Sequence, residues 1–283
     1  MNLQHNLTTD THIQEYDNGS VIYYDSISDP FKCVIEAYYL KDYSNTSFLC
    51  TPCYPYFSFN GNFIDPNILQ KYDNIIFVNF DHLQFDNYRN NLFNWLSQIN
   101  VTKIWEWQIP IMDMYPEHLR NKVEFMPLRY IPSYEEHVIK TSPDPRYLFA
   151  FCGTLSQRRI NILQYFATNY VPFKVIQGIR YTQCSCEFDG CCCVLNIHGD
   201  EGNFQEQLRI SEFLSLNIPV VSEVSEINYF GDLVKEFEYD DLRNLEFLYN
   251  PINNVALRYK QLTYKDEDFE RYRQQLLRYH RVL

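Results

Sequence analysis

Two patterns of hydrophobic residues alternate along the first half of the chain. Short apolar runs at 74–80 and 101–105 are typical of strands that are buried on both faces of a parallel sheet. Between them, apolar residues in 88–99 repeat every three or four positions, which predicts a helix. A further short helix is predicted at 116–120. Strands that alternate with helices indicate an α/β fold.

A second alternation begins at residue 147. The predicted elements are strand 147–152, a turn at Gly153, helix 158–168, strand 173–176, strand 191–197, helix 204–216 and strand 219–222. The segment 266–283 predicts a helix, since acidic residues in its first turn and basic residues in its last match the helix dipole. Near the start, residues 12–25 predict a β-hairpin, because Asn18-Gly19 suits a tight turn.

Prolines mark the region between the two alternations. Pro127, Pro132, Pro143 and Pro145 all lie there, which is typical of a linker. We therefore predict two α/β domains. Their expected ranges are 1–130 for the first, 131–145 for the linker, 146–265 for the second and 266–283 for the C-terminal helix.

Composition narrows the function. The 283 residues include 24 basic and 36 acidic side chains, a net charge of −12, which argues against binding to duplex nucleic acid. The first residues lack the basic and apolar regions of a signal peptide. No apolar run approaches the roughly 18 residues of a membrane span. We expect a cytoplasmic protein.

The nine cysteines are interpreted as free thiols in a reducing compartment. Cys184, Cys186 and the run 191–193 raise the alternative of a zinc site, but the run leads directly into an apolar strand. Cys50 and Cys53 stand beside prolines and lack the context of a redox motif. No Asp-x-Asp pair lies near a strand end. We therefore predict no metal.

Candidate chemistry concentrates in residues 194–223. On a helix, Glu206, Arg209 and Glu212 stand at i, i+3 and i+6 and form one polar stripe beside predicted buried strands. A solvated helix face is the alternative interpretation.

Gly153 opens a second candidate segment, between a strand and a helix. A glycine there lets backbone N–H groups and a helix N-terminus approach an anion. Arg158 or Arg159 would then neutralise a diphosphate without a metal. The alternative is an ordinary turn with surface arginines.

These segments resemble a known family. The block 194–223 is similar to the "NIH … E..R..E … PVVSE" signature of short glycosyltransferases with the GT-B fold, and 149–159 resembles the "F.G…..RR…L..L" turn of the same domain. Weaker likenesses occur at 79–83, 104–107 and 123–130, which resemble "N.EQL", "vWDYS" and "v.yvPlGY". The likeness covers roughly residues 75–235.

The resemblance implies two Rossmann-like domains that face each other across a cleft, with the C-terminal helix crossing back to the first. Glu212 would hold the ribose of a nucleotide-sugar donor, and Arg158 and Arg209 its diphosphate, with a pairing of Arg209 with Glu206 as the alternative. Phe204 stands where many relatives carry another acid. The full set implied for the donor is Gly153, Thr154, Arg158, Arg159, His198, Glu206, Arg209 and Glu212.

The first domain would bind the acceptor. The catalytic candidates are Asp81 and His82, which end the strand at 75–80, and Glu106 behind them. Tyr54, Tyr56 and Phe57 would stack on acceptor sugar rings, although core packing is an alternative use.

The implied reaction is the transfer of a sugar from a nucleotide diphosphate to a hydroxyl of a glycan. A UDP-sugar is favoured and a GDP-sugar comes next. Inversion is mildly favoured, and no cofactor is needed. Two alternatives stay open: a non-catalytic module that binds nucleotide or glycan, and a nucleotide-sugar epimerase.

Overall fold

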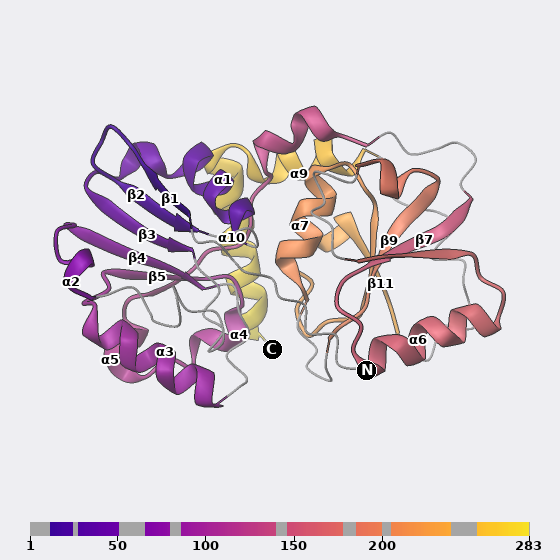
Figure 1. Ribbon diagram of the computed structural model, residues 1–283, viewed down its shortest axis with the longest axis horizontal. Helices are drawn as coiled ribbons and strands as arrows, with labels where there is room; N and C mark the ends of the chain where they lie inside the picture. The colour runs from indigo at the N-terminus through magenta and orange to yellow at the C-terminus, as the bar shows by residue number, and fades with distance from the viewer. Residues whose placement is uncertain are drawn as a thin grey trace. The chain divides into compact units, whose positions relative to one another are not determined.

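The computed structural model describes residues 12–24, 28–50, 66–79, 86–139, 146–177, 185–199, 205–238 and 254–282. The chain divides into two compact units, Met1–Pro127 and Leu128–Leu283, and each is built on one sheet (Figure 1). Both sheets combine parallel strands with helices, so both units are α/β, as predicted. The facing of two domains across a cleft stays a prediction.

The first unit carries its strands in chain order. The sheet runs β1 (His12–Glu15), β2 (Val21–Tyr24), β3 (Thr46–Cys50), β4 (Asn74–Asn79), β5 (Lys103–Glu106) and β6 (Val123–Phe125). Among the described strands of this sheet, β1 alone is antiparallel to its neighbour, in the predicted hairpin. This order contains no reversal, whereas a Rossmann-like sheet has one.

Helices cover the first sheet on both faces. They are α1 (Asp29–Tyr38), α2 (Pro66–Leu69), α3 (Asp86–Gln98), α4 (Ile109–Met112) and α5 (Glu117–Arg120), with a 3-10 turn at Leu40–Asp42. Side chains alternate along each strand. Leu49 and Phe77 therefore point into the core with Trp95 of α3, and Phe48 packs against Trp105 on the other face. Figure 1 shows α1 on one side of this sheet and α3 and α5 on the other.

The second unit carries five parallel strands. In spatial order they are β11 (Val234–Phe237), β10 (Val220–Glu223), β9 (Cys191–Asn196), β7 (Tyr147–Cys152) and β8 (Phe173–Ile176). The helices are α6 (Gln157–Thr168), α7 (Gln207–Ser215), α9 (Val255–Thr263) and α10 (Asp266–Val282), and 3-10 turns occupy Pro132–His137, Ser185–Phe188 and Gly231–Leu233.

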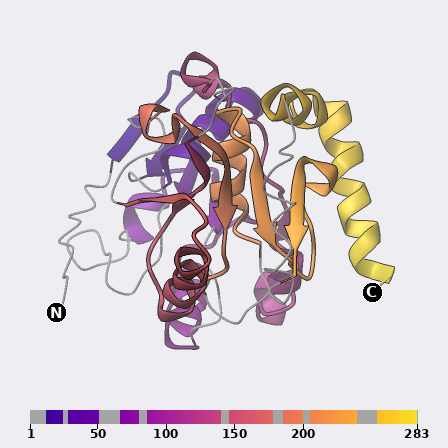
Figure 2. The same ribbon diagram turned by 90° about the vertical axis from the view of Figure 1, so that its right-hand side faces the viewer.

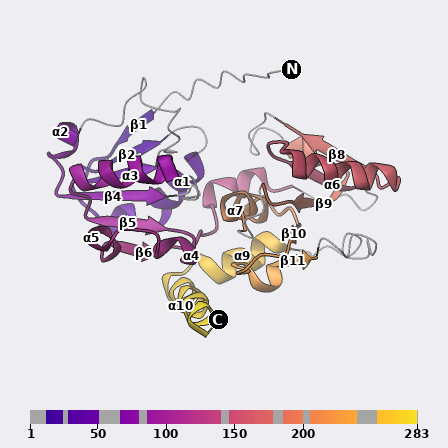
Figure 3. The same ribbon diagram turned by 90° about the horizontal axis from the view of Figure 1, so that it is seen from below.

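The second sheet does reverse its order. The chain passes from β7 to β8 on one side and then returns to β9 on the other side of β7. The α6 and α7 helices consequently lie on opposite faces of this sheet (Figures 1 and 3). Phe149 and Phe151 of β7 pack with Phe166 of α6. The point between β7 and β9 is a topological switch point, where open α/β sheets bind ligands.

The chain that follows Pro127 packs within the second unit. The backbone N–H of Ile131 donates to Ser215 Oγ at 3.0 Å, and that of Ile139 donates to Leu216 O at 2.9 Å. Ile131 and Ile139, which both belong to the segment predicted as a linker, thus contact the C-terminal end of α7. The α10 helix belongs to the same unit and meets α9 at a corner (Figure 2). Its predicted crossing to the first domain stays a prediction.

Candidate functional site

Polar residues gather at the carboxyl ends of three neighbouring strands of the second sheet. Gly153 follows β7, His198 follows β9 at a distance of two residues, and Glu223 ends β10. The first turns of α6 and α7 begin at the same edge. This edge includes the switch point between β7 and β9.

A serine closes the loop between β7 and α6. Ser156 is the N-cap of α6, and its Oγ accepts a hydrogen bond from the backbone N–H of Arg159 at 3.3 Å. The same hydroxyl donates to Gly199 O at 2.9 Å, beyond β9. A capping serine satisfies an otherwise unpaired N–H group at the start of a helix. Here it also fastens the loop after β7 to the loop after β9.

Arg159 is the most buried of three arginines at this edge, which are Arg158, Arg159 and Arg209, and only 6% of its side chain is exposed. Its Nε donates to Ile197 O at 2.9 Å and its Nη1 to Thr154 O at 2.8 Å, while Nη2 pairs with Glu206. These partners place the Arg159 guanidinium between the two loops. Its main role is therefore to hold the loops together.

Glu206 bridges two arginines from different helices. It stands immediately before α7, not within the helix as the sequence predicted, and its two carboxylate oxygens pair with Arg159 and Arg209. Arg209 also donates to Asn196 Oδ1 at 3.3 Å. The guanidinium of Arg209 lies against Gly153, where an added Cβ would be 3.0 Å from Nη2. Gly153 has φ +155°, a conformation that favours glycine.

Arg158 pairs with Glu223, which the sequence analysis did not select. Arg158 Nη1 donates to Glu223 Oε2 at 2.8 Å and to His198 O at 3.1 Å. The backbone N–H of His198 donates to the same carboxylate oxygen at 3.0 Å. Glu223 ends the "PVVSE" strand, and an acid at a strand end is the signal that would have identified it.

Three arginines gather at this edge. Arg158, Arg159 and Arg209 pair with Glu206 and Glu223, and a third carboxylate, Glu236, accepts a hydrogen bond from the backbone N–H of Ser225 at 3.3 Å. The N-termini of α6 and α7 add partial positive charge. Part of the Arg158 side chain, 29%, stays exposed to solvent. The arrangement is suited to an anion.

Glu212 lies further along α7 and is buried. Its Oε1 accepts a hydrogen bond from Tyr134 Oη at 2.9 Å, so it is held by the 3-10 turn at Pro132–His137. The predicted stripe therefore does not act as one unit: Glu206 and Arg209 pair with each other, while Glu212 contacts a different segment. Its predicted role toward ribose stays a prediction.

The first unit has a second polar cluster, also at the carboxyl edge of its sheet. Glu106 ends β5 and is fully buried. Its Oε2 accepts hydrogen bonds from Asn79 Nδ2 at 2.7 Å and Tyr115 Oη at 3.0 Å. Its Oε1 accepts from the backbone N–H groups of Trp107 and Gln108 at 3.0 and 3.1 Å. Glu106 is a candidate predicted from the sequence, whereas its four partners in this cluster are not.

Burial dominates the ionisation of Glu106. Removal from water raises the pKa of its carboxyl group to about 7, although the four hydrogen bonds oppose this rise. Beside it, Gln108 is fully buried, and both atoms of its side-chain amide lack a hydrogen-bond partner among the described residues. A carboxyl group that titrates near neutral pH is suited to proton transfer.

Several predicted residues lie outside the described part of the chain. They are Asp81, His82, Tyr54, Tyr56 and Phe57. Within the described ranges no three His, Cys, Asp or Glu side chains are placed to hold a metal ion. Cys191, Cys192 and Cys193 are free thiols there, and burial raises the pKa of Cys191 to about 11.

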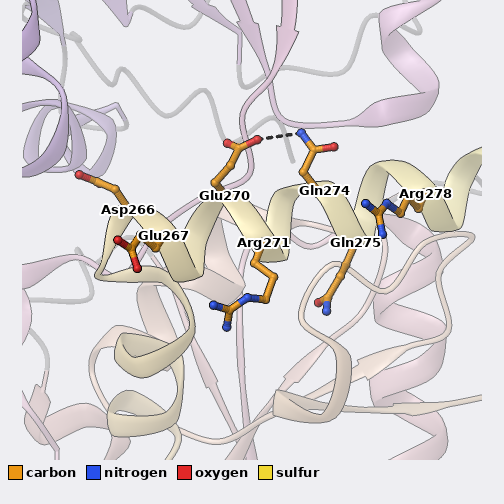
Figure 4. A pocket seen from close by; sticks show the side chains of 7 residues that line it. All are labelled: Asp266, Glu267, Glu270, Arg271, Gln274, Gln275 and Arg278. Carbon is orange, nitrogen blue, oxygen red and sulfur yellow. Dashed lines mark hydrogen bonds between the residues drawn. The ribbon is translucent and has the colours of Figure 1, made fainter.

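A pocket of about 680 Å³ lies along α10 (Figure 4). The described residues that line it all come from this one helix, between Asp266 and Arg278. Glu270 is bound by side chains of the same helix: Gln274 Nε2 donates to Glu270 Oε1 at 2.7 Å, and Arg273, outside the pocket lining, pairs with the same carboxylate. No strand end contributes to this pocket among the described residues.

None of the described helices is long and apolar enough to cross a membrane.

Comparison with known proteins identifies relatives without fixing a function. No family model matches the chain. Uncharacterized protein L140 of Acanthamoeba polyphaga mimivirus is 26% identical over 261 residues, which cover 85% of this chain and 82% of that protein.

Two solved structures align with the chain at low similarity. One is the Glycosylation Associate Protein (Gap123) complex from Streptococcus agalactiae, at 11% identity and a TM-score of 0.38, over 83% of this chain and 51% of that chain. The other is the glycotransferase of kitacinnamycin, at 11% identity and a TM-score of 0.33, over 89% and 79%. The chain thus spans about half the length of the first. Scores this low establish no common fold, so the class that the chain's own structure defines is an α/β protein with two largely parallel sheets.

Proposed function

We propose that this chain is a glycosyltransferase that moves a sugar from a nucleotide diphosphate donor to a hydroxyl of a glycan acceptor. One observation carries the proposal. Arg158 and Arg209 converge with the first turns of two helices on the switch point of the second sheet. The motif resemblance of the same residues to nucleotide-sugar enzymes supports it.

The physical case for a diphosphate rests on geometry and charge. Switch points bind ligands at the carboxyl ends of the strands, and helix N-termini favour anions. A guanidinium has five N–H donors, so Arg158 and Arg209 can keep their carboxylate partners and still bind phosphate oxygens. Gly153 leaves the space that Arg209 occupies. The proposed site neutralises the diphosphate without a metal ion.

Other roles follow from the same proposal. Glu212 would accept hydrogen bonds from the ribose hydroxyls, with Tyr134 holding its carboxylate in place. Asp81, His82 or Glu106 would take the proton of the acceptor hydroxyl, and Tyr54, Tyr56 and Phe57 would contact acceptor sugars. We favour a UDP-sugar as the donor, with a GDP-sugar next, and inversion at the transferred carbon.

A nucleotide-binding module without transfer activity is the second candidate. The specific observation in its favour is the state of Glu106, whose two carboxylate oxygens already accept four hydrogen bonds. To accept a proton from a substrate, Glu106 would have to give up one of these donors. Phe204, which stands where many members of the resembled family carry an acid, also favours a module without transfer activity.

Release of free nucleoside diphosphate tests transfer directly. The wild-type protein is incubated with UDP- and GDP-sugars and a panel of glycan acceptors, with and without EDTA. We expect acceptor-dependent release that EDTA leaves largely intact. Nucleotide binding with no release under any pairing would favour the binding module, and activity lost to EDTA and restored by manganese would contradict the metal-free site.

A further inference from the structure

His198 is fixed in the proposed donor site by its backbone. Its N–H donates to Glu223 and its carbonyl accepts from Arg158, so both ends of its peptide are held by the same ion pair. The residue is 2% exposed. The backbone of His198 therefore lies beside the Arg158 guanidinium.

The contacts of the ring define its tautomer. The Nε2 atom lies 3.2 Å from Val224 O and 3.2 Å from Ser225 Oγ. A backbone carbonyl only accepts hydrogen bonds, so Nε2 must carry the proton in order to bond to Val224. In the neutral imidazole the other nitrogen, Nδ1, is then an acceptor with an open lone pair.

That acceptor is buried and unsatisfied. Among the described residues, His198 Nδ1 has no hydrogen-bond partner. Buried polar atoms in folded proteins are nearly always paired, and an unpaired one costs free energy. An atom left unpaired at the edge of a ligand site points to a partner that the ligand supplies.

We propose that His198 Nδ1 accepts a hydrogen bond from a hydroxyl group of the nucleotide sugar. This inference rests on the proposed function and identifies which part of the donor the histidine recognises. The diphosphate of a nucleotide sugar is esterified at both ends and carries no hydrogen to donate at neutral pH, so a ring nitrogen that acts as an acceptor selects a hydroxyl instead. Arg158 binds the charged part of the donor, and the adjacent His198 binds a sugar or ribose hydroxyl.

Two substitutions separate the two ring nitrogens. His198→Asn keeps an acceptor near the position of Nδ1, whereas His198→Gln keeps a donor near Nε2 and removes the Nδ1 acceptor. Affinities for UDP-glucose, UDP, GDP-mannose, GDP and inorganic diphosphate are measured by calorimetry on the full chain. Melting temperatures check that both variants are folded.

We expect His198→Gln to weaken binding of the nucleotide ligand about tenfold, the effect of one lost hydrogen bond, while His198→Asn stays within about threefold of wild type. Inorganic diphosphate should bind all forms equally. A loss that is already present with the nucleoside diphosphate assigns the hydroxyl to ribose, and a loss seen only with the nucleotide sugar assigns it to the sugar.

Two results would overturn the inference. One is equal affinity of wild type and His198→Gln for the nucleoside diphosphates and for the nucleotide sugars alike, and the other is a parallel loss of affinity for these ligands and for inorganic diphosphate. The ¹⁵N signal of the His198 ring gives a second measurement on wild type: Nδ1 must be unprotonated without ligand and must shift when nucleotide is added. Failure of wild type to bind any nucleotide overturns the proposed function itself, whereas binding that ignores residue 198 overturns only this inference.

Discussion

Glu206 shows how single residues organise the proposed donor site. One carboxylate holds guanidinium groups from α6 and α7, and Arg209 then lies flat against Gly153. The position of Arg209 therefore depends on two features: a negative charge on one side and a missing side chain on the other. Both can be tested by substitution.

Replacement of Gly153 by alanine should displace Arg209. The new Cβ would lie 3.0 Å from Nη2 and 3.2 Å from Cζ, and φ +155° is unfavourable for alanine. We expect a loss of about 1–3 kcal/mol in unfolding free energy, measured with urea, and a weaker affinity for nucleoside diphosphate.

Gly231→Ala is the matched control for this experiment. Gly231 also has a positive φ, of 50°, but an added Cβ there meets no atom of the described chain within 4 Å. It should cost less backbone strain than Gly153→Ala, because other residue types adopt a φ near 50° in this chain, and it should leave nucleotide affinity unchanged. Equal affinity in Gly153→Ala and wild type would show that the Arg209 position does not matter for binding.

Glu106 should make stability depend on pH. Burial raises the pKa of Glu106 to about 7 in the folded state, whereas its ordinary value in the unfolded chain is near 4.5. Between these two pH values the folded protein keeps the proton on Glu106 and the unfolded chain has released it. The stabilisation is complete at low pH and is lost as pH rises through about 7. Unfolding free energy should therefore fall from about pH 5 to about pH 8, by at most roughly 1.4 kcal/mol per pH unit.

Glu106→Gln removes this titration. The variant should gain stability relative to wild type as pH rises, which urea unfolding at the two pH values measures. Glu124→Gln, in the neighbouring strand β6, removes a carboxylate that is 38% exposed and leaves the buried cluster intact. An unfolding free-energy difference between Glu106→Gln and wild type that is the same at both pH values would contradict the assignment.

At the scale of elements, the corner between α9 and α10 depends on one buried arginine. Arg129 is 1% exposed and donates to Thr263 O at 2.8 Å and Tyr264 O at 2.7 Å, at the C-terminal end of α9. It also pairs with Asp266 at 2.9 Å, and its guanidinium lies over the Phe269 ring. It thereby satisfies carbonyl groups that a helix end leaves open.

Arg129→Lys should destabilise this corner. A lysine keeps the charge but cannot reproduce the planar fork of the guanidinium, so we expect a loss of about 2–4 kcal/mol in urea unfolding. Arg271→Lys changes an arginine on α10 that is 68% exposed and should cost less than about 0.5 kcal/mol. Similar losses for both substitutions would refute the capping role.

Elements with a strong local signal were predicted well from the sequence. Strands β7 and β8 match their predicted bounds, and α6 begins one residue earlier than predicted. Among the unpredicted elements, α1 did carry a signal, since Pro30 stands at its start and Phe31, Val34 and Ile35 share one face. By contrast, β11 is four residues long and only its pairing with β10 identifies it.

The site could be predicted only as far as short-range patterns allow. Gly153, Arg158 and Arg209 stand beside turns and helix starts that the sequence marks. The partnership of Arg158 with Glu223 spans 65 residues, and burial of Glu106 depends on Tyr115 and Asn79 from other elements. These residues meet because the order of the strands in each sheet brings them together. No local pattern in a single sequence shows that order.

At the scale of the whole molecule, the two units differ in the charged residues at the carboxyl edges of their sheets. A net charge of −12 repels an anionic ligand at long range, so such a ligand needs a local excess of positive charge. Among the described residues, the carboxyl edge of the second sheet brings three arginines together. The corresponding edge of the first sheet carries Glu106 among neutral donors. This contrast is the reason that we propose the second unit as the nucleotide site.

Nucleotide affinity tests this assignment most directly. Calorimetric titration of UDP and GDP is compared for wild type, Arg158→Gln, Arg209→Gln and the surface control Arg271→Gln. We predict saturable binding of one of the nucleotides by wild type and the control, and a loss of at least about tenfold in both site variants, because each removes a charged hydrogen-bond donor to phosphate. Absence of binding by the folded wild type, or equal affinity in all forms, would contradict the account.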